Sequence, residues 1–332
     1  MQITVLTKTL LVSIGLAIVM VLVGVISICV GTSLVDLRSL LGLGSSSKEA
    51  QQAFIIITEY RLPRTLLAAI TGGGLASAGV VFQGVLRNPL ADPYIVGISA
   101  GGALGAVIAI VFMGEGNLVG TSLAAFVGSL VAVAVVYGLA SLKRGGQFTN
   151  TIILAGVIVA AFMNSIMLLI MSVSGSDEVQ RILFWLLGDF SLADYSRIRL
   201  GAVFVMIGWI AIYLNANSLN VLIAGDRAAT SLGLNVVVSQ TYLMAVAALI
   251  TGAVVSVAGT VGFVGLVVPH AMRLMFGPDN RVLLPAALFG GAAFLAAADC
   301  VARVVAYPVE LPVGVITAIA GAPFFLYLLV RR

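Results

Sequence analysis

The chain has 332 residues, of which 61% are apolar and 9% are charged, with 17 basic and 13 acidic side chains. A soluble domain carries roughly 25% charged residues, and a disordered chain needs low hydrophobicity with high net charge, so both classes are excluded. A mean hydropathy of +1.18 predicts an all-α polytopic membrane protein. The net charge of +4 does not indicate nucleic-acid binding, because cytoplasmic loops of membrane proteins are commonly basic.

Charged and turn residues divide the chain into ten apolar segments, and a membrane-spanning helix needs about 20 such residues. The expected spans lie near residues 9–31, 64–83, 95–113, 118–140, 151–172, 199–214, 236–259, 262–276, 282–305 and 313–330. Ten spans place both ends of the chain on one side of the membrane. The basic pairs Lys143-Arg144 and Arg331-Arg332 favour the cytoplasm as that side.

Three segments between the spans are long enough to have a role of their own. Residues 31–60 are expected to lie on the outer surface, and residues 177–195, with an aromatic group that includes Trp185, predict an interfacial helix outside. Residues 215–235 form an inner loop in which apolar and polar residues alternate at near-helical spacing. No stretch of the sequence has the character of a soluble ATPase or enzyme domain.

Glycine is abundant, and several glycines lie four residues apart within the expected spans. Gly97, Gly101 and Gly105 form one such series, and residues 72–74 with Gly79 form another. Small residues at this spacing allow helix backbones to approach closely in lipid. They predict tight helix packing within one subunit.

Nearly all charged residues lie at the ends of the expected spans. An ion-coupled carrier would be expected to keep an ionisable group near the membrane midplane, so this distribution disfavours the main alternative function, a stand-alone secondary transporter. Asp299 and Arg303 are four residues apart on one helix face and predict an ion pair. Arg61 and Arg64 begin a span at the positive end of its helix dipole. Their compensation could come from Glu59, from lipid phosphate or from an acidic docking partner.

Few side chains are available for catalysis or metal binding. His270 is the only histidine, and Cys29 and Cys300 both lie in apolar segments. These residues do not form the clusters that a metal site or a catalytic triad requires. The sequence therefore predicts a protein that is not an enzyme and that binds no metal or cofactor of its own.

Five ordered motifs resemble those of the FecCD family of ABC importer permeases. They are Arg61-Leu-Pro-Arg64, Arg87-Asn-Pro-Leu-Ala-Asp-Pro93, Gly262-Phe-Val-Gly-Leu-Val-Val-Pro-His270, Ala298-Asp-Cys-Val-Ala-Arg303 and Glu310-Leu-Pro-Val-Gly314. The resemblance extends over nearly the whole chain. It implies one transmembrane permease domain over residues 1–332, with the vitamin B12-importer-type fold and a cytoplasmic coupling loop at 215–235.

The resemblance also implies partners and cargo. A FecCD permease pairs with a second permease subunit as a homodimer or pseudo-dimer, with two cytoplasmic ATPase subunits that bind ATP and Mg²⁺, and with an extracytoplasmic solute-binding protein. It lies in the cytoplasmic membrane and imports a ferric siderophore, haem or cobalamin by ATP-driven alternating access. We expect a ferric siderophore as cargo here, with haem and cobalamin as alternatives.

Three groups of residues match functional positions of the family. Docking of the binding protein is implied for Arg61, Arg64 and Arg303. Coupling to the ATPase is implied for Leu219, Asn220, Gly225, Asp226, Ala229, Leu232 and Gly233. A cytoplasmic gate is implied for Asn88, Leu90, Thr149 and Asn150. Tyr94 departs from the family pattern, in which glycine is usual at that position.

Overall fold

The computed structural model describes residues 4–31, 47–114, 117–142, 148–191 and 193–330, and within these ranges it has helices and turns but no strand. The predicted all-α fold is therefore confirmed. Ten of its helices lie where the ten spans were expected. They are α1 (Val5–Cys29), α4 (Leu62–Val85), α5 (Ile98–Phe112), α6 (Leu118–Leu142), α7 (Phe148–Val173), α9 (Tyr195–Leu214), α12 (Val236–Ala258), α13 (Val264–Phe276), α14 (Asn280–Val304) and α15 (Val313–Val330). In the described part of the chain seven helices are long and apolar enough to cross a membrane, and α5, α13 and α15 are shorter.

Shorter helices occupy the segments between the spans. They are α3 (Ser47–Ile55), the π-helix η1 (Ile56–Arg61), the 3-10 helix η2 (Pro93–Val96), α8 (Ser176–Leu186), α10 (Ala216–Ile223) and α11 (Asp226–Ser231). The predicted interfacial helix is shorter than expected, because α8 ends before Gly188, whose φ is 75°. The inner loop contains two helices, which Gly225 separates with a φ of 115°, a backbone conformation that favours glycine. Residues 32–46 of the outer loop lie outside the described ranges.

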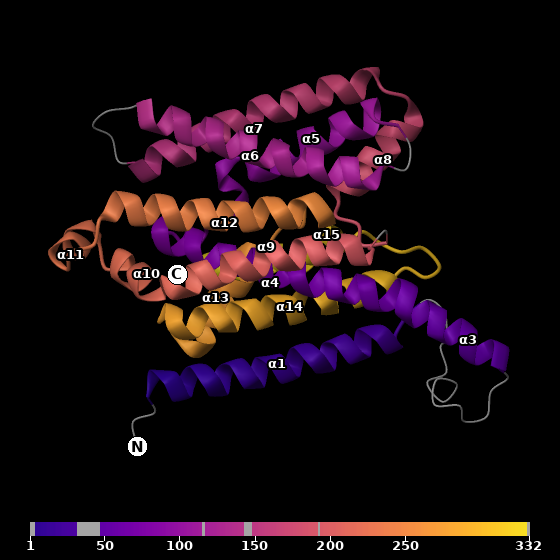
Figure 1. Cartoon of the computed structure of the whole chain (residues 1–332), viewed down its shortest axis with the longest axis horizontal. Helices are drawn as coiled ribbons and strands as arrows, with labels where there is room; N and C mark the ends of the chain where they lie inside the picture. The colour runs from indigo at the N-terminus through magenta and orange to yellow at the C-terminus, as the bar shows by residue number, and fades with distance from the viewer. Residues whose placement is uncertain (1–3, 32–46, 115–116, 143–147, 192, 331–332) are drawn as a thin grey trace.

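The helices form a bundle in which the two ends of the chain lie at the same end (Figure 1). This end also carries α10 and α11, and the opposite end carries α3 and α8. Following the predicted orientation, we call them the inner end and the outer end. The central helices α4, α12 and α14 are mostly buried inside the protein, whereas α1 at one edge is almost entirely exposed.

The expected close packing at glycines is reciprocal at two helix pairs, and Gly79 of α4 packs in the same way against the carbonyl group of Gly265 of α13. A Cβ atom at Gly72 of α4 would collide with the carbonyl group of Gly291 of α14, and the reverse is also true. Gly101 of α5 and Gly128 of α6 stand in the same reciprocal relation. Each pair brings two helix backbones together at a distance that a side chain would prevent.

Two interruptions of the helices meet inside the protein. Helix α12 ends at Ala258, before Gly259, and α13 begins after Phe263, whose φ is 69°. The Tyr94 hydroxyl group of η2 donates a hydrogen bond to the Val261 carbonyl group and accepts one from the Val261 N–H group, each at 3.1 Å. Irregular backbone at membrane depth needs such internal partners, because lipid offers none.

Candidate functional site

The three outer arginines line one cavity at the outer end of the bundle. Arg61 ends η1, Arg64 lies in the first turn of α4, and Arg303 lies in the last turn of α14. Their cavity has a volume of about 300 Å³ and is completed by Gly31, Ile56, Tyr60, Ser191 and Glu310. The fold thus brings together residues that are 242 positions apart in the sequence.

Two carboxylates compensate Arg64 and Arg303. Arg64 Nε lies 2.8 Å from Asp299 Oδ1, and Arg64 Nη1 lies 2.5 Å from Glu310 Oε2. Arg303 Nε lies 3.2 Å from Asp299 Oδ2, which confirms the predicted ion pair between residues four apart. The compensation of Arg64 comes from within the chain, from α14 and from the segment before α15, rather than from any of the three sources considered in the sequence.

Arg61 is bound in a different way. Its Nη1 donates hydrogen bonds of 2.9 and 3.0 Å to the carbonyl oxygens of Ile28 and Cys29 at the end of α1. A Cβ atom at Gly31 would lie 2.6 Å from Nη2 of Arg61, so the chain after α1 passes directly against the guanidinium group. Arg61 therefore holds the end of α1 beside the cavity that it lines together with Arg64 and Arg303.

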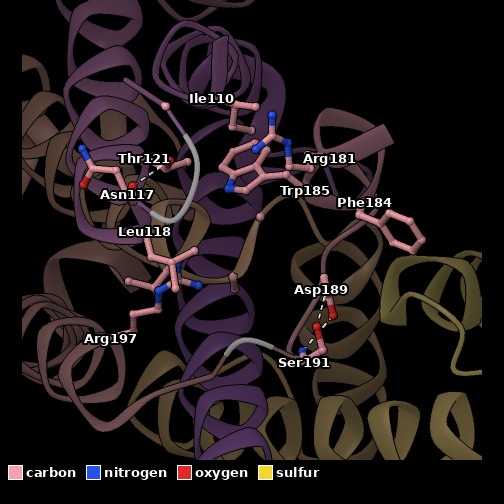
Figure 2. Close-up of a pocket in the computed structure, with 14 residues that line it drawn as sticks. Ile110, Asn117, Leu118, Thr121, Arg181, Phe184, Trp185, Asp189, Ser191 and Arg197 are labelled. Atoms are coloured by element: carbon pink, nitrogen blue, oxygen red, sulfur yellow. Dashed lines mark hydrogen bonds between the residues drawn. The ribbon is translucent and has the colours of Figure 1, made fainter. Parts of the chain in front are cut away.

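A second outer cavity, shown in Figure 2, adjoins the first. Its volume is about 280 Å³, and it is bounded by the turn between α5 and α6, by α8 and by the start of α9. Figure 2 shows Arg181 and Trp185 on α8, Arg197 on α9, and Ser191 donating two hydrogen bonds to Asp189. Asp189 and Ser191 also line a hollow with Arg64 and Glu310. The hollows at the outer end therefore extend from the cavity of Arg61, Arg64 and Arg303 to the cavity of Arg181 and Arg197.

The predicted coupling residues lie at the inner end on α10, α11 and their flanks, a region that we call the docking segment (residues 215–235). Leu219 and Ala229 are fully buried against the bundle. Leu232 is 71% exposed, and Cβ atoms added at Gly225 or Gly233 would meet no atom within 4 Å. The segment therefore has one face anchored in the permease and one face open.

Two polar contacts attach the docking segment to the bundle. Asn220 donates a hydrogen bond of 2.9 Å to Asp279 Oδ1 and accepts one of 2.9 Å from the Asn280 N–H group, in the turn that begins α14. Hydrogen bonds from Arg281, assisted by the one from Asn220, lower the pKa of Asp279 to about 2. The second contact is made by Arg87, which reaches Leu222 and Asp226 of the docking segment.

Arg87 follows α4 in the left-handed region of the backbone, with a φ of 49°. Its Nε donates a hydrogen bond of 3.0 Å to the Leu222 carbonyl group, and its Nη2 pairs with the Asp226 carboxylate. The turn that carries the predicted gate residue Asn88 is therefore tied to the docking segment through the preceding residue.

Comparison with known proteins assigns the chain to a family. The FecCD transport family matches residues 18–331. The chain belongs to the FecCD transport family. It is 44% identical to the cobalamin import system permease protein BtuC of Halobacterium salinarum over 85% of this chain and 75% of that protein. It is 37% identical to the hemin transport system permease protein HmuU of Yersinia pestis, with 82% of each chain covered.

A solved structure gives the same assignment. A metal-chelate type ABC transporter in an inward-facing conformation is similar with a TM-score of 0.84 and 29% identity, over 96% of this chain and 99% of that chain. The resemblance predicted from the sequence motifs is thereby confirmed. The FecCD chain is a transport permease subunit of the ABC type and is not itself an enzyme.

Two of the four predicted gate residues of this FecCD chain, Asn88 and Leu90, have side chains that the structure describes. Asn88 Oδ1 accepts a hydrogen bond of 2.9 Å from the Leu90 N–H group, and the Leu90 side chain is 49% exposed at the inner end. Thr149 and Asn150 lie in the first turn of α7, and their side chains are outside the described set.

Sequence reasoning did not identify four partners in this FecCD chain. The two members of each pair are separated by 59 to 246 positions in the sequence. The pairs are Arg64 with Glu310, Asn220 with Asp279, Arg87 with Asp226, and Tyr94 with Val261. Glu310 and Arg87 do lie within the family motifs. Their positions in the motifs indicate that these two residues have a functional role, but do not identify the residues that they contact.

The only histidine has a packing role. The His270 ring lies against the rings of Phe324 and Phe325 of α15, with centroid distances of 6.4 and 6.2 Å. Among the described residues no group of three or more His, Cys, Asp or Glu side chains is placed to hold a metal ion.

Proposed function

We propose that this chain is the permease subunit of a binding-protein-dependent ABC importer that moves a ferric siderophore, with haem or cobalamin as alternative cargo. The relatives named above are permeases for cobalamin and hemin, and another is the iron(3+)-hydroxamate import system permease protein FhuB of Bacillus subtilis. Hydroxamates that bind Fe³⁺ are siderophores, which supports the first choice.

The observation that carries the proposal is the docking segment at the inner end. It is too short to span a membrane, its apolar side is buried in the bundle, and Leu232 with Gly225 and Gly233 leaves the other side open. A permease with no ATPase domain in its own sequence needs such a surface to receive one. We assign this role to Leu219, Asn220, Gly225, Asp226, Ala229, Leu232 and Gly233, and place both chain ends and this segment in the cytoplasm.

The outer arginine cavity is proposed to receive the solute-binding protein. Three guanidinium groups line this cavity of about 300 Å³ together with Glu310, and Asp299 pairs with two of them, so basic side chains are concentrated at this place. An acidic side chain of a partner complements their positive charge and is steered toward it. The binding protein encloses the cargo, so the permease does not need to coordinate it.

Transport is proposed to proceed by alternating access. Closure of two ATPase subunits on ATP and Mg²⁺ displaces the docking segment, and the helices move as rigid bodies about a pore between two permease copies. Asn88, Leu90, Thr149 and Asn150 close the cytoplasmic end of that pore.

The test is uptake by proteoliposomes that contain the permease, its ATPase and its binding protein. We expect uptake of ferric siderophore that requires ATP, the ATPase and the binding protein together. Parallel vesicles are given haem and cobalamin, and preferential uptake of either changes the cargo but not the mechanism. Uptake driven by an ion gradient in vesicles that lack the ATPase would instead establish the secondary transporter.

A further inference from the structure

Residues 86–97 join α4 to α5 and are bonded at each end to a different part of the protein. We call them the connector. Near its start, Arg87 donates to the Leu222 carbonyl group and pairs with the Asp226 carboxylate of the docking segment. Near its end, the Tyr94 hydroxyl group bonds to both backbone groups of Val261 in the interruption between α12 and α13. The connector thus links the inner surface to the protein interior.

The connector is internally stiff. Pro89 and Pro93 fix two of its φ angles. Successive turns are closed by hydrogen bonds from backbone N–H groups. These run from Ala91 to the Asn88 carbonyl at 3.0 Å, from Tyr94 to Asp92 Oδ1 at 2.8 Å, and from Gly97 to the Tyr94 carbonyl at 3.0 Å. A displacement at one end is therefore transmitted along the segment rather than absorbed by loose backbone.

Two helices bear directly on the connector. A Cβ atom at Gly265 of α13 would lie 2.6 Å from Cγ of Pro93, and one at Gly156 of α7 would collide with the carbonyl oxygen of Ile95. At both places a glycine lets the helix backbone lie directly against the connector, against the Pro93 ring at Gly265 and against the Ile95 carbonyl group at Gly156. Helix α7 also carries the predicted gate positions 149 and 150 in its first turn.

We propose that the connector carries the displacement of the docking segment to α7 and α13, with Arg87 and Tyr94 as the positioning residues at its two ends. The inference rests on the proposed function, because it assumes that the docking segment is moved by an ATPase. An exposed ion pair is weak by itself, but Arg87 adds a hydrogen bond to a carbonyl group, and a docked ATPase lowers the local dielectric and strengthens both contacts.

The experiment compares two small changes in the assembled transporter. Tyr94→Phe removes only the hydroxyl group that holds Val261. Arg87→Lys keeps the charge but loses the planar fork that contacts Leu222 and Asp226 together. We expect each variant to assemble with the ATPase and to hydrolyse ATP, but to import about fivefold fewer cargo molecules per ATP. Mutations along a coupling network change the coupling free energy by amounts that correspond to a loss of this size.

Two control variants make the same kinds of substitution at exposed residues elsewhere in the helix bundle. Arg199→Lys alters an exposed arginine of α9 away from the docking segment, and Tyr242→Phe removes an exposed hydroxyl group from α12. Both should keep the unaltered ratio of cargo to ATP. Arg87→Asp should also uncouple transport, and combining it with Asp226→Arg should raise the ratio above that of either single variant.

Two results would overturn the inference. One is an unaltered ratio in both Tyr94→Phe and Arg87→Lys, and the other is uptake and hydrolysis falling in proportion. If Arg87→Lys does not assemble, Tyr94→Phe decides alone, because it removes a single oxygen atom. Absence of ATP-dependent uptake by the unaltered transporter would overturn the proposed function and, with it, this inference.

Discussion

Asp299 of α14 accepts a hydrogen bond of 2.8 Å from Nε of Arg64 of α4, at a place where the aspartate side chain has no exposed surface. The same carboxylate lies 3.2 Å from Nε of Arg303. One buried negative charge therefore holds two buried arginines and joins the outer ends of the two most closely packed central helices.

The first prediction concerns the stability of this cluster. Asp299→Asn keeps the shape of the side chain but leaves Arg64 and Arg303 close together without their shared counter-charge. Removing one partner of a buried ion pair costs about 3–5 kcal/mol, so the unfolding temperature of the purified permease should fall markedly. Glu310→Gln is the matched control, because Glu310 contacts the same Arg64 from a partly exposed position. Equal losses for the two variants would contradict the central role of Asp299.

The second prediction concerns docking of the binding protein. Arg64→Glu is a poor test, because it places a carboxylate against Asp299 and disrupts the fold. Arg61→Glu reverses a charge in the same cavity and leaves the pairs of Asp299 with Arg64 and Arg303 in place, because Arg61 donates to the main-chain carbonyl groups of Ile28 and Cys29. We expect at least about tenfold weaker binding, since like charges then face each other, with loss of stimulated ATPase activity and survival of basal activity.

Two comparisons sharpen the docking test. Arg199→Glu makes the same charge change on an exposed arginine of α9 and should bind normally. Glu310→Gln removes a negative charge from the cavity and should tighten binding by about two- to fivefold, the range for one exposed ion pair. Weaker binding by Glu310→Gln would show that the cavity does not receive a carboxylate.

The third prediction concerns the gate. In a background that lacks Cys29 and Cys300, Leu90→Cys and Thr149→Cys should each form cross-links between two permease copies in one nucleotide state and lose them in another. The reason is that a gate on the pore axis brings equivalent residues of two copies together when it closes. Ser141→Cys, near the inner end of α6, is the control and should not cross-link. Cross-linking that is identical in all nucleotide states would refute the gate.

The helices of this fold were predictable from the sequence, and most of the contacts between them were not. Apolar length and the positions of charges determine where a helix can cross a membrane, so a helix lies at each expected position, seven of them long and apolar enough to span. The amphipathic pattern of the inner loop predicts helical structure, whereas the exact place where it divides depends on one residue with a positive φ, Gly225.

The site shows the same division. The ion pair of Asp299 with Arg303 was predicted because a separation of four residues fixes two side chains on one helix face. The pairing of Arg64 with Glu310 spans 246 positions and depends on how α4, α14 and α15 pack. Spacing within one element carries geometric information, whereas contacts between distant elements require the assembled fold.

The fourth prediction is a pH dependence at the inner end. Hydrogen bonds from Arg281 and Asn220 hold the pKa of Asp279 at about 2, below its ordinary value of 3.8. A lowered pKa in the folded state means that the ionised carboxylate contributes stability above about pH 4, and that this contribution is lost as the pH falls toward 2. The difference in unfolding temperature between the unaltered protein and Asp279→Asn should be constant from pH 8 to 5 and should narrow by pH 3. A difference that changes near neutral pH would contradict this assignment, and Arg281→Gln should weaken the effect.

The last prediction tests the ATPase surface without disturbing the backbone. Bulky residues at Gly225 or Gly233 would strain positions with φ values of 115° and 81°, so a loss of coupling there would have two explanations. Leu232 is 71% exposed, and Leu232→Asp should leave the permease inserted and as stable as before. It should weaken ATPase binding by at least about tenfold, because truncating or charging a central apolar anchor typically costs 2 kcal/mol or more. Gln180→Asp introduces the same charge on an exposed residue of α8 at the outer end and should bind the ATPase normally. Co-purification of the ATPase with each variant from the same detergent gives the measurement. Undiminished binding by Leu232→Asp would remove the docking segment from the interface, because no other change in that variant could compensate for a buried, unpaired carboxylate.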